Sequence, residues 1–188
     1  MFLMKELVTD FDIVFRCESS EKLDEFLVSY EGTEKSCLYV FDLSNEYVDN
    51  SIKLKNCRLK GKYKHVMSNV SNGSFEMFKN ILDFDRNYDF FKNEYVVFCD
   101  GIQLFDDTLD VSASVINEKK CLLVSPVSVD QDGSLKHVGT FNPKCFIVNR
   151  SIASKILNNF KVKDYQTFIE LAKVNNNKFV FSNAMVFE

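Results

Sequence analysis

The sequence predicts an α/β fold, a three-layer sandwich in which helices cover both faces of a mainly parallel β-sheet. Short segments rich in β-branched and aromatic residues alternate with amphipathic segments along the 188 residues, as in repeated strand–helix–strand units. Residues 95–99 are almost wholly apolar, which is typical of a central strand covered on both faces. With 46% apolar residues and only two prolines, the chain is predicted to form a single domain over residues 1–188.

The first elements are predicted to form a strand–helix–strand unit. The apolar run at residues 11–15 favours a strand, and the serine pair at residues 19–20 is typical of a helix start. Apolar residues then recur at helical spacing as far as residue 30. A second strand is expected at residues 37–41, followed by a polar loop through residue 50.

A basic run follows between residues 52 and 65. Its cations are Lys53, Lys55, Arg58, Lys60, Lys62 and Lys64. On an extended segment such alternating positions share one face, which suits either phosphate binding or simple solvation. A short strand is predicted at residues 63–66, and an amphipathic helix at residues 74–84.

The second half continues the alternation. A helix is expected to begin in residues 105–109, and a polar turn at residues 130–133. The remaining expected elements are strands at 95–99, 121–125, 145–149 and 178–187, and helices at 152–157 and 165–174.

The amino-acid composition excludes several classes of function. The net charge of -4 gives no general attraction for polyanions, and the absence of tryptophan beside 19 phenylalanines excludes a tryptophan shelf for sugars. The six cysteines form no C-x-x-C pair, so we expect reduced core residues of a cytoplasmic protein, with disulfides as the alternative. No stretch approaches the roughly 20 apolar residues of a membrane-spanning helix.

Two aspartates directly follow predicted strands, Asp42 and Asp100. Ligands of parallel sheets bind beyond the carboxyl ends of the strands, so these residues together are candidates to hold a ligand or a hard cation. The alternative is that aspartate simply ends each strand. The two histidines, His65 and His137, are far apart in the sequence, and we expect both at the surface. No G-x-S-x-G, phosphate-cradling glycine loop or H-E-x-x-H occurs, which argues against hydrolases, kinases and dehydrogenases.

The order of these segments resembles the inverting family 2 of the nucleotide-sugar glycosyltransferases, which have the glycosyltransferase-A fold. Residues 15–20, beginning Phe15-Arg16, occupy the place of that family's first loop, and Phe41-Asp42-Leu43-Ser44 resembles its V-D-D-x-S element. Residues 69–80, with Asn69 and Gly73, resemble its N-x-G-x-x-x-A-x-N segment. The strand ending at Asp100 resembles the one that leads into the D-x-D metal motif.

The later segments follow the same family order. Residues 125–133 resemble the strand and hairpin after the metal motif, and residues 141–150 resemble the acceptor-side strand. Lys163-Asp164 stands at the E-D pair, and the chain ends on Glu188 where the family has a histidine metal ligand. The departures are Ile102 at the second aspartate of D-x-D, Lys163 at the first acid, and Glu188 at the histidine.

The resemblance implies a transferase that moves a sugar from a nucleoside diphosphate sugar, a UDP-sugar in the first instance, to an acceptor hydroxyl. The residues implied to bind the nucleotide sugar are Phe15, Arg16, Asp42, Asn69, Gly73 and Asp100. The resemblance further implies a divalent cation, Mn²⁺ or Mg²⁺, held by Asp100 and Glu188, and Asp164 as the base that accepts the proton of the acceptor hydroxyl.

Two alternatives stay open. The abundance of Asn, Lys and Phe is typical of an AT-rich coding source such as a phage, where small glycosyltransferases modify DNA bases, and the basic run would then contact DNA. The other alternative is a catalytically silent nucleotide-binding or interaction domain that kept the fold while its D-x-D motif decayed.

Overall fold

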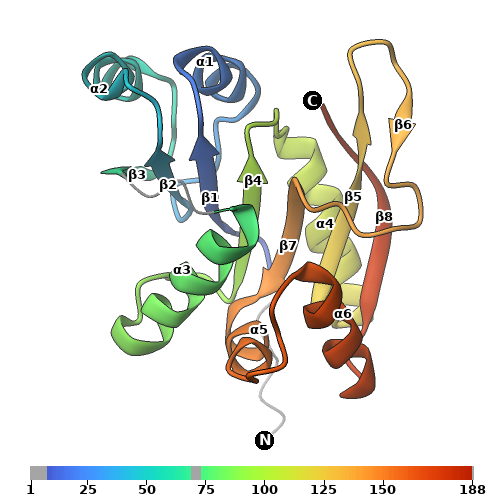
Figure 1. Ribbon diagram of the computed structural model, residues 1–188. Coiled ribbons are helices and arrows are strands. Elements are labelled where there is room, and N and C mark those ends of the chain that lie inside the picture. The colour runs from blue at the N-terminus through green and yellow to red at the C-terminus, as the bar shows by residue number, and fades with distance from the viewer. Residues whose placement is uncertain (1–7, 69–72, 188) are drawn as a thin grey trace, which may run out of the picture.

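The computed structural model describes residues 8–68 and 73–187, which are organised around one eight-stranded sheet (Figure 1). The strands are β1 (Asp12–Cys17), β2 (Cys37–Asp42), β3 (Lys62–Met67), β4 (Tyr95–Asp100), β5 (Leu123–Val129), β6 (Leu135–Lys136), β7 (Cys145–Asn149) and β8 (Phe179–Phe187). The helices are α1 (Ser20–Ser29), α2 (Tyr47–Asn56), α3 (Ser74–Tyr88), α4 (Asp106–Lys119), α5 (Arg150–Leu157) and α6 (Tyr165–Val174).

The sheet is mixed but mainly parallel. The strand order is β3-β2-β1-β4-β7-β5-β6, with β8 pairing β5 off this path. The neighbouring strands β3, β2, β1 and β4 are all parallel, β7 runs antiparallel to β4 and β5, and β8 is parallel to β5. The carboxyl ends of the four parallel strands therefore meet at one edge, the upper edge in Figure 1.

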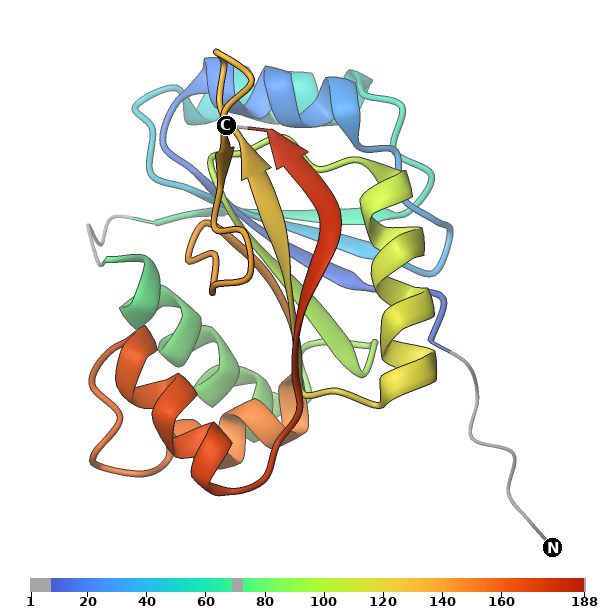
Figure 2. The same ribbon diagram turned by 90° about the vertical axis from the view of Figure 1, so that its right-hand side faces the viewer.

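Helices cover both faces of the sheet, so the predicted three-layer α/β architecture is confirmed (Figure 2). On one face, α1, α2 and α4 contribute Phe26, Leu54 and Leu109 to a buried cluster that includes Val97 of β4. On the other face, α3, α5 and α6 form a second cluster rich in aromatic rings. Phe78 of α3 lies at its centre, with ring centroids 4.8–5.4 Å from those of Phe98, Phe146 and Phe168.

Capping side chains explain why the predicted starts of α1 and α6 are correct. Ser19 is the N-cap of α1, where its side chain accepts a hydrogen bond from the Lys22 amide. Asp164 caps α6 in the same way, with a reciprocal contact from Thr167 that completes a capping box. These side chains satisfy amides that the first helical turn leaves without partners.

Helix α2 is the main difference from the sequence prediction, which placed a polar loop through residue 50 and an extended basic segment after it. The Glu46 N-cap makes no side-chain capping bond, and Asn50 and Leu54 are the buried residues of α2, so the sequence carries little helical signal there. The basic run is consequently split between α2 and β3. The single cationic face predicted for it is wrong.

The basic side chains are also partly engaged within the protein. The Lys60 ammonium lies 2.9 Å from a Glu31 carboxylate oxygen, and the Lys64 ammonium lies over the rings of Tyr39 and Phe90. All six cysteines are unpaired, and five of them are buried as the sequence predicts, whereas Cys57 is partly exposed. Within residues 8–68 and 73–187, no helix has both the length and the apolar character needed to span a membrane.

Candidate active site at the carboxyl edge of the sheet

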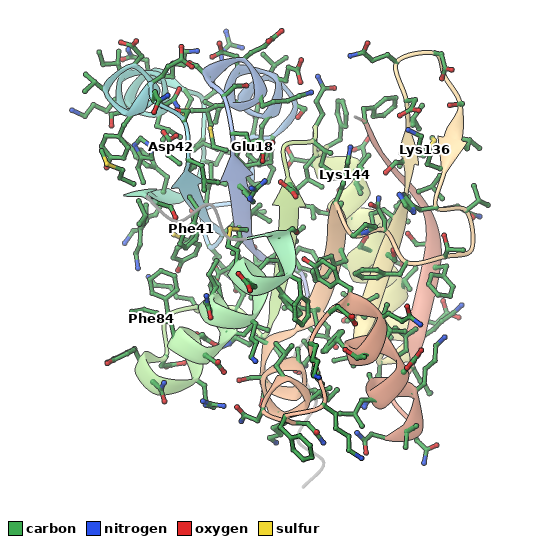
Figure 3. The ribbon with its side chains drawn as sticks, viewed as in Figure 1. Glu18, Phe41, Asp42, Phe84, Lys136 and Lys144 are labelled. Carbon is green, nitrogen blue, oxygen red and sulfur yellow. The ribbon has the colours of Figure 1, made fainter. Side chains whose placement is uncertain are left out.

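A cavity of about 630 Å³ opens beyond the carboxyl ends of β1, β2 and β3. Its lining is Arg16, Glu18, Leu43, Ser44, Asn45, Tyr47, Met67 and Ser68. Figure 3 shows Glu18 and Asp42 near the upper ends of β1 and β2, on the side where the cavity lies. Hydroxyl, amide, aromatic and charged groups converge here, which is the usual character of a polar ligand site in an α/β sheet.

Arg16 is the principal cation of this cavity. It is the register partner of Asp100 on the adjacent strand β4, and its Nη1 donates a 2.9 Å hydrogen bond to Asp100 Oδ1. The same Nη1 donates to Glu18 Oε1. The Arg16 side chain is only 14% exposed. Burial opposes the charged form, but the hydrogen bonds and charges of Asp100 and Glu18 outweigh it, so the pKa of Arg16 is raised.

Asp42 is fully buried and its carboxylate is already occupied by the protein. Oδ1 accepts from the amide and hydroxyl of Ser44 at 2.9 and 2.6 Å, and Oδ2 lies 2.8 Å from both Asn50 Nδ2 and His65 Nε2. Burial alone would raise the pKa of Asp42, but the hydrogen bonds from Ser44, Asn50 and His65 together lower it. The carboxylate thus fixes the β2–α2 connection that forms one wall of the cavity.

Asp42 and Asp100 are not brought together. Side chains alternate between faces along a strand, so Asp42 lies on the same face of β2 as Leu38 and Val40. Those two residues pack in the cluster under α1, α2 and α4. Asp100 lies on the same face of β4 as Phe98, which packs in the cluster under α3, α5 and α6. The two carboxylates therefore project to opposite faces of the sheet and do not converge on one ligand atom.

Tyr47 is a wall of the cavity that sequence reasoning missed, because it lies in the first turn of the unpredicted helix α2. Its ring stacks on His65 with centroids 4.0 Å apart and an angle of 16° between the planes. The His65 side chain is 6% exposed, and its Nδ1 lies 2.9 Å from Ser51 Oγ. The predicted surface position of His65 is wrong, since the imidazole joins Asp42 to Tyr47.

The remaining predicted nucleotide-binding residues differ in accessibility. Phe15 is fully buried against Phe26 of α1, so its side chain does not reach the cavity. Gly73 is the N-cap residue of α3, with open space where a Cβ would lie. Asn69 and the predicted metal ligand Glu188 lie outside the described residues.

Asp164 has a structural task at the start of α6. Its Oδ1 accepts hydrogen bonds of 2.8 Å from the amide and from the hydroxyl of Thr167, and these bonds lower its pKa. The neighbouring Tyr165 lies with its hydroxyl 2.8 Å from that of Ser74, so the starts of α3 and α6 are in contact. The role of Asp164 as a base stays a prediction.

The described residues do not fit a divalent cation. At the second acidic position of the D-x-D pattern stands Ile102, which is 2% exposed and belongs to the apolar core. Glu18 and Asp100 approach each other, but a guanidinium already lies between them. Within the described ranges, no group of three or more His, Cys, Asp or Glu side chains is arranged to hold a metal.

An apolar recess adjoins the polar cavity. It has a volume of about 380 Å³, shares Leu43 and Ser68 with the cavity, and extends between β3 and α3 along Phe41, Phe84 and Phe90. Phe41 and Phe84 are labelled in Figure 3. The site therefore has a polar compartment next to a mainly aromatic one.

Solved structures identify the class of fold. No protein-family model matches the chain, and no curated protein matches it. The crystal structure of S. aureus TarS 1–349 aligns with a TM-score of 0.59 and 16% identity over 96% of this chain and 58% of that chain. The mannosyltransferase PcManGT from Pyrobaculum calidifontis, in complex with GDP-Man and Mn²⁺, aligns with a TM-score of 0.63 and 13% identity over 99% and 61%.

Two further solved structures also align with this chain. GalNAc-T7 with UDP, GalNAc and Mn²⁺ aligns with a TM-score of 0.61 and 13% identity, over 95% of this chain and 43% of that chain. The 4-diphosphocytidyl-2C-methyl-D-erythritol synthase of Anaerococcus prevotii aligns with a TM-score of 0.55 and 11% identity, over 95% and 87%. The chain thus has the glycosyltransferase-A type of fold found in nucleotide-sugar and nucleotidyl transferases, and it spans about three fifths or less of the three glycosyltransferases.

Proposed function

We propose that this chain is a glycosyltransferase that binds a nucleoside diphosphate sugar, a UDP-sugar in the first instance, and transfers the sugar to an acceptor hydroxyl. The observation that carries this proposal is the cavity at the carboxyl edge of β1–β3, where a largely buried guanidinium and a stacked tyrosine lie in one polar site. Two structural neighbours with this type of fold, PcManGT and GalNAc-T7, are structures with GDP-Man and with UDP.

Each wall of the cavity suits one part of such a donor. The Tyr47 ring is backed by His65 on one face, so it is a rigid platform on which a nucleobase can stack. Asn45 and Ser68 offer an amide and a hydroxyl group for the base edge and the ribose, whereas the Ser44 hydroxyl is held by Asp42. The guanidinium of Arg16 matches the oxygens of a diphosphate.

The reaction itself requires a base near the acceptor. As the acceptor oxygen bonds to the anomeric carbon, the bond from that carbon to the diphosphate breaks, the nucleoside diphosphate leaves, and the hydroxyl proton passes to a carboxylate. Asp164 is our candidate for that carboxylate, because it stands at the second position of the E-D pair in the family that the sequence resembles.

Isothermal titration with UDP, GDP, CDP, ADP and dTDP, each with and without Mn²⁺, tests the proposal. We expect one of these nucleotides to bind, and Tyr47→Ala to weaken it about tenfold, because loss of base stacking costs about 1–3 kcal/mol. Tyr47→Phe keeps the ring, and Tyr88→Ala removes an exposed tyrosine at the far end of α3, so neither should change the affinity. If no member of the panel binds, the proposal fails.

Nucleotidyl transfer is the second candidate, because the chain covers 87% of the A. prevotii synthase. Such enzymes hold a triphosphate, and glycine-rich loops commonly do so. The β1–α1 connection contains Glu18 and Ser19 but no glycine, which favours a diphosphate donor instead. Release of pyrophosphate from CTP or UTP with a sugar phosphate would favour this candidate over ours.

Two alternatives remain, a transferase that acts on DNA and a catalytically silent domain, and assays of the acceptor and of turnover distinguish them. If the acceptor is DNA, retention on DNA should weaken with salt and with the Lys60→Glu, Lys62→Glu and Lys64→Glu triple change. The division of the basic run between α2 and β3 gives this alternative less support than the sequence did. Hydrolysis or transfer of any sugar nucleotide would exclude a catalytically silent domain.

A further inference from the structure

The guanidinium of Arg16 lies between two carboxylates of the site, those of Glu18 and Asp100. Hard divalent cations bind by gathering carboxylate and phosphate oxygens around themselves. Here Glu18 and Asp100 both bond a single nitrogen, Arg16 Nη1, so the same oxygens are gathered around a side-chain cation instead. A dication at this point would have to displace the guanidinium or accept its repulsion.

This arrangement is fixed by the backbone of the sheet. Arg16 and Asp100 are register partners on the parallel strands β1 and β4. Directly after Asp100, the Gly101 amide donates a 3.2 Å hydrogen bond to the Arg16 carbonyl, and Gly101 adopts a φ of +61°, which favours glycine. The Asp100 amide in turn donates to the Lys144 carbonyl at 2.8 Å. The pair is therefore anchored on three segments of chain.

We propose that Arg16 is the cation that binds the diphosphate of the nucleotide, so that nucleotide binding by this chain needs no divalent metal. This inference rests on the proposed function. Arginine presents a planar fork of donors that matches phosphate oxygens, and its charge is permanent. Arg16 Nε is buried and has no hydrogen-bond partner among the described residues, so the fork is not saturated by the protein.

Glu18 and Asp100 play different parts in this proposal. Asp100 lies in a strand, is 23% exposed, and orients the guanidinium. Glu18 lies in the β1–α1 connection and is 60% exposed, so its bond to Nη1 is readily exchanged. A diphosphate and the Glu18 carboxylate compete for the same nitrogen. Removing the charge of Glu18 should therefore tighten nucleotide binding.

The experiment is a calorimetric titration of the nucleoside diphosphate that binds most tightly in the panel above, in buffer with EDTA and again with Mn²⁺. For the wild type we expect the same affinity, within about twofold, in both buffers. Arg16→Gln should weaken binding about 10- to 100-fold, as expected for loss of a charge-assisted hydrogen bond. Glu18→Gln should tighten binding about 2- to 5-fold.

Arg150 provides a matched control. Its side chain is 21% exposed, and its Nη1 bonds Asp85 and Asp89 at 2.9 Å, so it is also a guanidinium held by two carboxylates. It begins α5 after the end of β7, at the opposite edge of the sheet from the cavity. Arg150→Gln removes an equivalent ion pair and should leave the nucleotide affinity unchanged.

The possible outcomes separate this inference from the proposed function. If EDTA abolishes binding and Mn²⁺ restores it, the inference is overturned while the glycosyltransferase proposal stands. If no nucleotide binds in either buffer, both are overturned. Should Arg16→Gln fail to fold, Arg16→Lys and Glu18→Gln replace it. The lysine variant should bind more weakly than the wild type because it lacks the fork, and an unchanged affinity in both variants would overturn the inference.

Discussion

Replacement of Asp42 by Asn tests whether this buried carboxylate builds the cavity or contacts the ligand. Asn keeps the size of the side chain but turns one acceptor oxygen into a donor. That donor would face either Ser44 or the pair of Asn50 and His65, all of which the native carboxylate binds at 2.6–2.9 Å. Hydrogen bonds to a charged group contribute about 1.5–3 kcal/mol each and are not additive, so we expect a loss of about 3 kcal/mol in the free energy of unfolding.

Thermal and urea unfolding at pH 7 measure this loss. For a chain of this length, about 3 kcal/mol corresponds to a fall of about 6–12 °C in Tm. Asp132→Asn is a matched control, because Asp132 also accepts from the amide of a serine two residues later, at 2.9 Å, but in an exposed turn. That change should alter stability by less than about 0.5 kcal/mol.

The pH dependence gives an independent check. Because the pKa of Asp42 is lower in the folded protein than its ordinary value of 3.8, the carboxylate stabilises the fold above that value. This contribution is lost as the pH falls through the folded-state pKa, so wild type and Asp42→Asn should converge in stability in strong acid. An Asp42→Asn protein that has the same Tm as the wild type at pH 7 but does not bind nucleotide would refute our reasoning. Asp42 would then be a residue that contacts the ligand.

Three further predictions concern other parts of the molecule. Asp164→Asn should keep the helix cap and change stability little, whereas Asp164→Ala should cost about 1 kcal/mol in urea unfolding. Loss of turnover in the Asn variant without loss of stability would identify Asp164 as the base. Phe78→Ala removes the ring at the centre of the aromatic cluster and should cost about 3–5 kcal/mol, and a loss below about 1 kcal/mol would show that the cluster is loosely packed. Burial raises the pKa of the Cys17 thiol to about 12, so a thiol reagent at pH 8 should modify the partly exposed Cys57 long before Cys17, and equal rates would contradict this packing.

The sequence determined most of the secondary structure and the class of the fold. Hydrophobic runs identified β1, β2, β4, β5 and β7, because strands at the centre of a sheet bury both faces and contain few polar residues. The edge strand β3 is mostly exposed and contains no such run. The serine pair at residues 19–20 predicts the start of α1, and the start of α6 at Tyr165 is also predicted, since capping side chains act locally and can be read from neighbouring positions. The order of these elements also supported the glycosyltransferase-A type of fold.

Helix α2 shows where local information ends. It lacks a capping side chain and has a narrow buried stripe, so its stability comes from packing against the rest of the protein. Because the sequence does not predict α2, it also does not predict the stack of Tyr47 on His65. The same gap made the basic run look like one extended surface.

The sequence by itself determined that Asp42 and Asp100 end two strands, and that Arg16 lies near the end of a third. Only the tertiary structure decided which of them meet. The register of β1 against β4 sets Arg16 beside Asp100, while the alternation of side chains directs Asp42 to the opposite face, toward Asn50 and His65. Strand pairing brings together Arg16 and Asp100, which are 84 positions apart in the sequence. No local sequence pattern predicts a contact between residues so far apart.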